Sequence, residues 1–189
     1  MKFEQCNRVN VLMSSYNKPW FIAGGWAIDL FIGKQTRPHD DLEIAIFRKD
    51  QLHLKDYFQD WEFNKVSNGT LYRWEKELLQ LPIHEIHAEH KYNDQQQLEI
   101  LLNEADNDKW LFRRDALITH PVESIWSYSA SRIPFLNPQI VLLYKVKNTR
   151  EKDHQDFFAA LPNLNENQKE WLRHAIQIHS PEHTWLEFL

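Results

Sequence analysis

Short apolar segments, separated by polar or glycine-containing turns, make up the first two thirds of the chain. Residues 20–22 are apolar, and the glycine pair at positions 24 and 25 is followed by a helical pattern that ends near Gly33. This order predicts a strand, a tight turn and a helix. From Asn137 onward the pattern becomes helical, with an amide cap followed by a proline at the first helical position.

Glycine is rare in this chain, and three of its four glycines lie close together, at Gly24, Gly25 and Gly33. Glycine inside a helix or strand costs roughly 1 kcal/mol relative to alanine, so its placement indicates a backbone requirement. Main-chain amides exposed at such a turn, beside the amino end of a helix, would suit a phosphate group. A plain tight turn between strand and helix is the alternative interpretation.

Two predicted strands carry acidic side chains on an otherwise apolar background. In residues 41–47, Asp41 and Glu43 point to one side while the alternate apolar positions point to the other. Their Cα atoms would lie roughly 6.5 Å apart, so that both carboxylates could reach one cation. In residues 98–102, Glu99 interrupts a second apolar strand in the same way. The alternative is a sheet with one face in water, which would make all three acids ordinary surface residues.

Composition narrows the functional classes. The 189 residues, of which 42% are hydrophobic, suffice for one domain or a domain with a small appendage. The balance of 22 Lys and Arg against 27 Asp and Glu disfavours a nucleic-acid partner. The lack of an apolar run of roughly 18 residues argues against a membrane protein. A single cysteine, Cys6, and an amino terminus without the apolar stretch of a signal peptide fit a cytoplasmic protein.

The order of these motifs resembles the nucleotidyltransferase superfamily, which has the fold of DNA polymerase beta. The run from residue 24 to 46, with Gly-Gly-Trp-Ala-x-Asp followed by Thr-Arg-x-His-x-Asp, is similar to the aminoglycoside and lincosamide nucleotidyltransferases of antibiotic resistance. Residues 110–114, 133–147, 152–157 and 183–186 extend the resemblance. Glu43 and Glu99 depart from the family pattern, because many members have aspartate at these positions and each glutamate adds a methylene group.

The resemblance implies an α+β nucleotidyltransferase fold: a mixed β-sheet flanked by helices in residues 1–136, followed by a helical bundle in residues 137–189. It also implies an enzyme that moves a nucleoside monophosphate, in the first place AMP from ATP, to a hydroxyl of a small molecule and releases pyrophosphate. Asp41, Glu43 and Glu99 would hold magnesium, in two positions, with Glu99 also accepting the hydroxyl proton. The triphosphate would contact the following residues: Gly24, Gly25, Arg37, His39 and Lys145.

Several of these assignments have structural alternatives. His39 could be a purely structural histidine, and Lys145 could belong to a solvated helix face. Thr149 is predicted to cap a helix that runs through Ala160, and Asn165 with Gln168 resembles a capping box for a last helix. Two aspartates on the predicted helix of residues 149–160, Asp153 and Asp156, are expected to be helix-surface or interdomain pairs. One further set, His84, His87 and His90, lacks the spacing of a zinc site if that segment is helical.

The acceptor and the partners stay open at this level. The acidic balance suits a cationic acceptor such as an aminoglycoside. Glu104, Asp106 and Asp108 could line its side of the site, although a run of this kind is usually a solvated loop. A catalytically weakened nucleotide-binding or regulatory module of the same fold is the alternative, as is nucleotidylation of a macromolecule. The eight tryptophans would allow a homodimer whose second copy completes the cleft.

Overall fold

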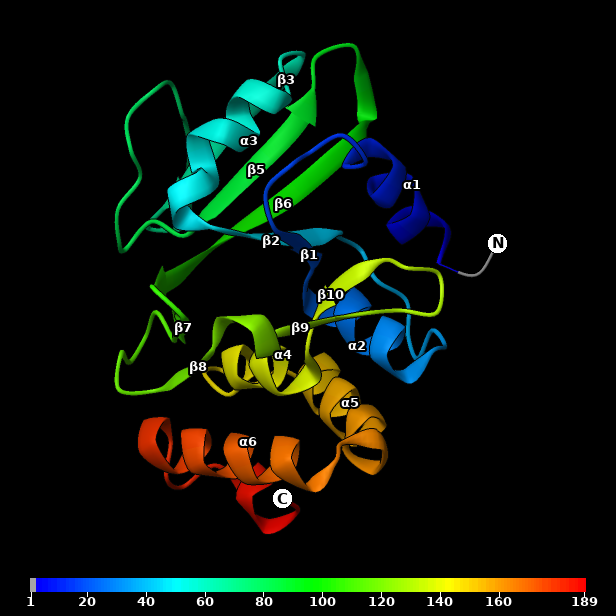
Figure 1. The fold of residues 1–189 in the computed structure, drawn as a ribbon, viewed down its shortest axis with the longest axis vertical. Helices are drawn as coiled ribbons and strands as arrows, with labels where there is room; N and C mark the ends of the chain where they lie inside the picture. Colours follow the sequence, from blue (N-terminus) through cyan, green and yellow to red (C-terminus); the bar gives the residue numbers. More distant parts are fainter. Residues whose placement is uncertain (1–2) are drawn as a thin grey trace.

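The computed structural model describes residues 3–189, which form one mixed β-sheet with helices beside it and at one end (Figure 1). The strands are β1 Trp20–Ile22, β2 Glu43–Phe47, β3 Trp61–Ser67, β4 Thr70–Arg73, β5 Glu85–His90, β6 Asn93–Asp106, β7 Lys109–Leu111, β8 Thr119–Pro121, β9 Trp126–Tyr128 and β10 Pro134–Leu136. The helices are α1 Glu4–Leu12, α2 Gly24–Ile32, α3 Gln51–Tyr57, α4 Pro138–Lys145, α5 Glu151–Ala160 and α6 Glu166–His179. The predicted α+β class is confirmed.

The sheet places β2 and β6 side by side at its centre. Its main path follows the order β4-β3-β5-β6-β2-β1-β10-β9, while β7 pairs with β6 and β8. β2 runs parallel to β6 and antiparallel to β1, so both of its edges are hydrogen-bonded to neighbouring strands. Residues 44–47 of β2 are all buried. A sheet with one face in water, the alternative for this strand, is therefore excluded.

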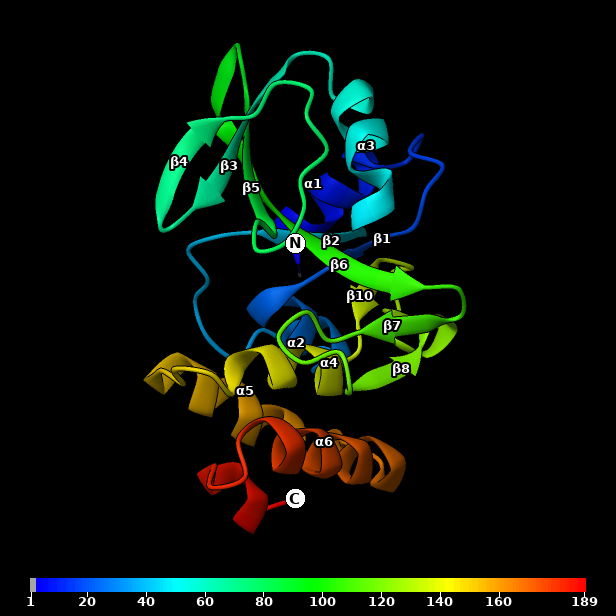
Figure 2. The ribbon, with the colours of Figure 1, turned by 90° about the vertical axis from the view of Figure 1, so that its left-hand side faces the viewer.

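Helices cover the two sides of the sheet and gather at one end of the molecule. Helix α3 lies over the β3 and β5 region, as Figure 2 shows, where the Lys55 ammonium group lies over the rings of Phe63 and Trp74. Helix α4 packs against α2, α5 and α6, and α4, α5 and α6 lie toward the end opposite β4 in Figure 2. The apolar stripe of α6 is core, since Leu172 and Ile176 are fully buried. Among residues 3–189 no helix combines the length and apolarity that crossing a bilayer requires.

Most predicted helix ends agree with the structure, including the end of α2 before Gly33 and that of α5 at Ala160, and two predicted caps do not. Proline opens α4, but the side chain of Asn137 donates to a loop carbonyl instead of capping the helix. Thr149 donates its hydroxyl to two carbonyl oxygens at the end of α4, so it closes that helix, whereas α5 starts with a capping box at Arg150. The expected cap by Thr149 was thus wrong. The capping box of Asn165 and Gln168 at α6 is confirmed.

Candidate active site

The three predicted metal-binding acids come together on one face of the central strands. Glu43 begins β2 and lies directly opposite Glu99 of β6 in the parallel pairing, so the two side chains are neighbours on the same face. Asp41 lies two residues before β2 and is exposed. All three line one cavity of about 450 Å³, called the central cavity below. The predicted alternation in both strands is confirmed, because the apolar positions between these acids are buried.

Gly24 has no side chain, and this leaves room for the carboxylate of Glu43. Gly24 is the first residue of α2 and has a positive φ of 58°, a conformation that glycine adopts without strain. A Cβ atom at this position would lie 1.4 Å from Oε2 of Glu43. The carboxylate therefore packs directly on the amino end of α2, where main-chain amides and the helix dipole favour negative charge.

Gly25 makes room for two further predicted residues in the same way. A Cβ atom there would lie 2.4 Å from Nη2 of Arg37 and 2.6 Å from Nδ1 of His39. Two contacts fix the His39 ring: its Nε2 lies 2.5 Å from a carboxylate oxygen of Asp29, and the ring packs on Trp26. The glycine pair is thus the first turn of the helix itself, shaped to receive side chains from the following loop.

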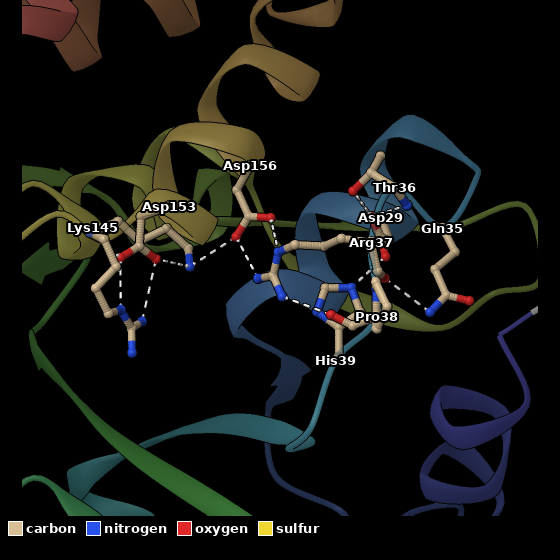
Figure 3. A network of polar contacts seen from close by, with 10 residues as sticks. Asp29, Gln35, Thr36, Arg37, Pro38, His39, Lys145, Asp153 and Asp156 are labelled. Atoms are coloured by element: carbon tan, nitrogen blue, oxygen red, sulfur yellow. Dashed lines mark hydrogen bonds and ion pairs between the residues drawn. The ribbon is translucent and has the colours of Figure 1, made fainter.

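The buried Asp29 organises that loop. Its second oxygen accepts hydrogen bonds from the main-chain nitrogen of Thr36 at 2.9 Å and from the Thr36 hydroxyl at 2.6 Å (Figure 3). Asp29 is fully buried, and these partners together with His39 satisfy its carboxylate. The loop between α2 and β2 is therefore tied to α2, which fixes the position of the acids that follow it.

A second network joins that loop to helix α5. Arg37 makes a bidentate ion pair with Asp156, in which Nε and Nη2 each lie 2.8 Å from a carboxylate oxygen (Figure 3). Lys145 lies 3.0 Å from Asp156 and 2.8 Å from Asp153, and Arg150 also donates to Asp153. Both aspartates are buried, so the expectation of helix-surface residues was wrong and that of pairing is confirmed. Burial opposes the charge of Asp153, but its bonds from Arg150 and Lys145 lower its pKa well below the usual range.

The acids on the central strands, Glu43 and Glu99, have by contrast no ion pair with a lysine or arginine among the described residues. Burial raises the pKa of Glu43, Lys145 opposes this increase, and Asp41 and Glu85 add to it. Burial and the neighbouring Glu43 raise the pKa of Glu99 to about 7. Carboxyl groups with raised pKa values in a cavity bind a cation favourably, because the cation removes the repulsion between them.

A second hollow adjoins the first at the same acids. This outer groove, of about 1150 Å³, runs between α1 and the strands β3 to β6. Asp40, Asp41 and Glu99 line both the central cavity and the outer groove. Among the described residues that line the groove, carboxylates outnumber cationic side chains, and the one arginine, Arg8, is paired with Glu4.

The central cavity is also lined by cations, which include Arg37 and Lys145 and are called the basic wall below. Arg113 and Arg114 follow β7 there, and Lys147 and Lys152 come from the start of the helical region. Burial lowers the pKa of Arg113, whose guanidinium lies over the ring of Tyr144 and has no carboxylate partner among the described residues. The cavity is thus lined by both acids and cations.

All the predicted site residues line the central cavity, as do some that sequence reasoning missed. The predicted ones are Asp41, Glu43, Glu99, Gly24, Gly25, Arg37, His39 and Lys145. The missed ones include Glu85, which lies in a stretch without a motif pattern, and Arg113, which lies in the stretch of residues 110–114 that carries the family resemblance but was given no role. Within the described residues, Glu104, Asp106 and Asp108 line neither hollow: Glu104 is 2.6 Å from Arg48, and Asp106 and Asp108 are exposed, in agreement with the alternative of a solvated loop.

The histidine-rich segment is a strand rather than a helix. In β5, His87 lies directly opposite Glu99, while His84 precedes the strand and His90 ends it. A helical spacing was the wrong basis for judging these residues. Successive side chains of a strand point to opposite faces, so the three histidines do not converge on one ion.

The sheet order, the acids on adjacent strands and the helical end define a nucleotidyltransferase fold. Two solved structures share it. The antibiotic-resistance factor ANT(2'')-Ia in complex with adenylyl-2''-tobramycin matches with a TM-score of 0.61 and 16% identity, over 93% of this chain and 99% of that one. The lincosamide antibiotic adenylyltransferase LnuA, bound to lincomycin, matches with a TM-score of 0.57 and 17% identity, over 84% and 96% of the two chains.

The sequence itself gives the family. The profile of the aminoglycoside-2''-adenylyltransferase family matches residues 6–160, and the chain belongs to that family. A search of curated protein sequences gave no match. The match covers the helix-start glycines, all three acids and both networks around Asp29 and Asp156.

Proposed function

We propose that this protein is a magnesium-dependent nucleotidyltransferase that moves a nucleoside monophosphate, AMP from ATP, to a hydroxyl group of an aminoglycoside-like or lincosamide-like molecule. Membership of the aminoglycoside-2''-adenylyltransferase family supports the reaction class. The observation that carries the proposal is that Asp41 and Glu99 line both the central cavity, which has a basic wall, and the acidic outer groove. One hollow suits a triphosphate and the other a cationic acceptor.

The donor set fits magnesium. Asp41, Glu43 and Glu99 offer only carboxylate oxygens, the ligands that this ion prefers. The packing of Glu43 on Gly24 holds one of these carboxylates beside the amino end of α2, where a phosphate would also be favoured. When bound there, magnesium ions would neutralise charge on the triphosphate and on the oxygens that attack and leave. The extra methylene of Glu43 is accommodated by the space that Gly24 leaves.

The side chains on the basic wall would bind and orient the triphosphate. Lys145 uses two of its three N–H donors on Asp153 and Asp156, and the third is available to a phosphate oxygen. Arg37 is held by Asp156, so it presents a fixed guanidinium edge beside the glycine amides. Arg113, without a carboxylate partner among the described residues, would meet the negative charge with a full positive charge.

Glu99 would accept the proton of the acceptor hydroxyl. The hydroxyl oxygen forms a bond to the α-phosphorus, the bond from that phosphorus to the pyrophosphate oxygen breaks, and the proton passes to a Glu99 oxygen. A carboxylate with a pKa of about 7 is suited to this role, since proton transfer is most effective when the pKa lies near the working pH. Glu99 also lines the groove in which the acceptor would lie.

The experiment that tests the proposal measures pyrophosphate release. Each of the four nucleoside triphosphates is combined with a panel of aminoglycosides and lincosamides, and mass spectrometry identifies the modified acceptor. We expect release with ATP and at least one acceptor, and its loss in Asp41→Asn. Binding of triphosphate without turnover, measured by calorimetry, would favour a nucleotide-binding module instead. Transfer of labelled nucleotide only to protein or RNA in a lysate would favour a macromolecular acceptor.

A further inference from the structure

Strand β5 places two more metal-binding side chains beside Glu99. His87 pairs directly with Glu99 across the antiparallel β5–β6 ladder, and Glu85 lies two residues earlier on the same face of β5. Nε2 of His87 lies 2.8 Å from a carboxylate oxygen of Glu85 and 3.9 Å from one of Glu99. One ligand atom from each of the three residues lies within 4.8 Å of the other two.

These distances suit a small tetrahedral ion. In a zinc site with metal–ligand bonds of about 2.0–2.2 Å, neighbouring ligand atoms lie roughly 3.4 Å apart. The two distances from His87 fall on either side of that value, so small side-chain rotations would close the geometry. Strand pairing fixes the backbones of β5 and β6, so only side-chain rotations would be needed to bind a metal.

The ligand chemistry differs from that of the proposed magnesium position. Asp41 and Glu43 present oxygen only, which magnesium prefers, whereas His87 adds an imidazole nitrogen. Imidazole together with carboxylate favours Zn²⁺ and related transition metals. Three partly exposed side chains form the cluster, with exposed fractions of 30% for Glu85, 36% for His87 and 25% for Glu99, so an ion can enter from solvent and keep a water ligand.

The electrostatic surroundings also favour a cation. Glu43 lies directly opposite Glu99 on the neighbouring strand β2 and Glu85 lies on the same face of β5, while the basic side chain in contact with Glu99 is His87, at 3.9 Å. Lys145, in contrast, pairs directly with Asp153 and Asp156. A dication between Glu85 and Glu99 would remove repulsion that the described side chains leave in place.

We propose that Glu85, His87 and Glu99 form a binding site for a transition-metal dication of the Zn²⁺ class, distinct from the oxygen-only position at Asp41 and Glu43. The site shares Glu99 with the proposed catalytic acids, so an ion held there would draw Glu99 away from the magnesium position. Metal binding to this site needs neither nucleotide nor acceptor. Its test therefore stands apart from the test of the proposed function.

The experiment titrates Zn²⁺ into metal-free, nucleotide-free protein and follows binding by isothermal titration calorimetry. We expect one strong site in the wild type and at least about tenfold weaker binding in His87→Gln, which is at least the loss caused by changing an outer-shell partner. The matched control is His90→Gln on the same strand, which should bind Zn²⁺ as the wild type does. Asp41→Asn should also keep the site, because Asp41 is not one of its ligands.

A measurement on the unaltered protein guards against a variant that fails to fold. Nitrogen-detected NMR of the histidine rings should show that one equivalent of Zn²⁺ shifts the ring nitrogens of His87, with those of His90 unmoved. The proposal is overturned by the absence of a strong site, by equal Zn²⁺ affinity in the wild type and a folded His87→Gln, or by resonance shifts at other histidines instead. Loss of binding in Asp41→Asn as large as in His87→Gln would place the ion in the magnesium position and overturn it too.

Discussion

Two groups of charged side chains meet at the central cavity, and they differ in how their charges are balanced. The loop-and-helix group, Arg37, Lys145, Asp153 and Asp156, consists of ion pairs at 2.8–3.0 Å with both aspartates buried. The sheet group, Asp41, Glu43 and Glu99, has an excess of negative charge, and the pKa of Glu99 is raised to about 7. The first arrangement stabilises the fold and orients its cations.

The contrast teaches where to expect chemistry. A satisfied buried network costs a great deal to break, because removal of one partner leaves the other charge uncompensated. The sheet group behaves in the opposite way, because its acids repel one another. Removal of one acid relieves this repulsion in the metal-free protein. Repulsion among these acids lowers the stability of the metal-free protein. Such a loss of stability indicates a site that is organised to bind a cation and a substrate. The predictions below test this opposition.

The largest expected effect is the loss of activity on removing a metal-binding acid. Asp41→Asn removes one carboxylate charge without changing the size of the side chain, so kcat for pyrophosphate release should fall by about 10³-fold or more, a magnitude in line with loss of a main electrostatic element. Asp41 is exposed, so the thermal midpoint should not fall. Asp108→Asn is the matched control and should keep full activity. A folded Asp41→Asn that keeps more than about a tenth of the wild-type kcat would contradict the assigned role.

The second effect is on stability, in the satisfied group. Asp156→Asn leaves Arg37 and Lys145 without their shared partner, so the free energy of unfolding should fall by about 3 kcal/mol in urea denaturation. Asp108→Asn, on an exposed hairpin, should change it little. An Asp156→Asn variant as stable as the wild type would show that the network is not balanced as described.

The third effect has the opposite sign and depends on pH. The pKa of Glu99 is raised from 4.5 to about 7, so folded, metal-free protein binds the proton more tightly than unfolded protein, and stability falls as the pH rises through that range. Glu99→Gln lacks this titration. It should be more stable than the wild type by about 1–3 kcal/mol at pH 8 and equal to it at pH 4. Thermal melts in a chelating buffer at both pH values measure the difference. A variant less stable than the wild type at pH 8 would refute the proposed repulsion among the sheet acids.

The smallest effects separate the two hollows. Arg113→Ala should raise KM for the triphosphate several-fold and leave KM for a cationic acceptor unchanged, because Arg113 lies only on the basic wall. Glu89→Gln should do the reverse, since Glu89 lines only the outer groove. Each change corresponds to about 1 kcal/mol for one charge that solvent reaches. Equal effects of either variant on both substrates would argue against separate places for nucleotide and acceptor.

The sequence predicted the elements of this site better than their connections. Alternation at Asp41, Glu43 and Glu99 identified the cavity-facing acids, because a period of two is a property of any strand. The glycine pair was found from its rarity, although it proved to be the first turn of α2. The segment with His87 was misjudged, since a short run of mixed residues carries no clear period.

Long-range pairing explains what the sequence did not predict. The role of Asp156 depends on Arg37, a partner 119 positions away, and no local pattern indicates such a bond. Glu85 and Arg113 reach the cavity only because β5 and β7 pair with β6. Thr149 had the residue type of a helix cap, but tertiary packing turned its hydroxyl to the end of the preceding helix. The division into residues 1–136 and 137–189, the dimer and the cytoplasmic location stay predictions.

A crystal structure with Mn²⁺ and a non-hydrolysable ATP analogue tests the central claim most directly, because manganese takes oxygen ligands as magnesium does and is visible by anomalous scattering. We predict an anomalous peak bonded to carboxylate oxygens of Asp41 and Glu43, with the triphosphate beside Gly24 and Lys145. A bound nucleotide whose manganese contacts none of Asp41, Glu43 and Glu99 would contradict it.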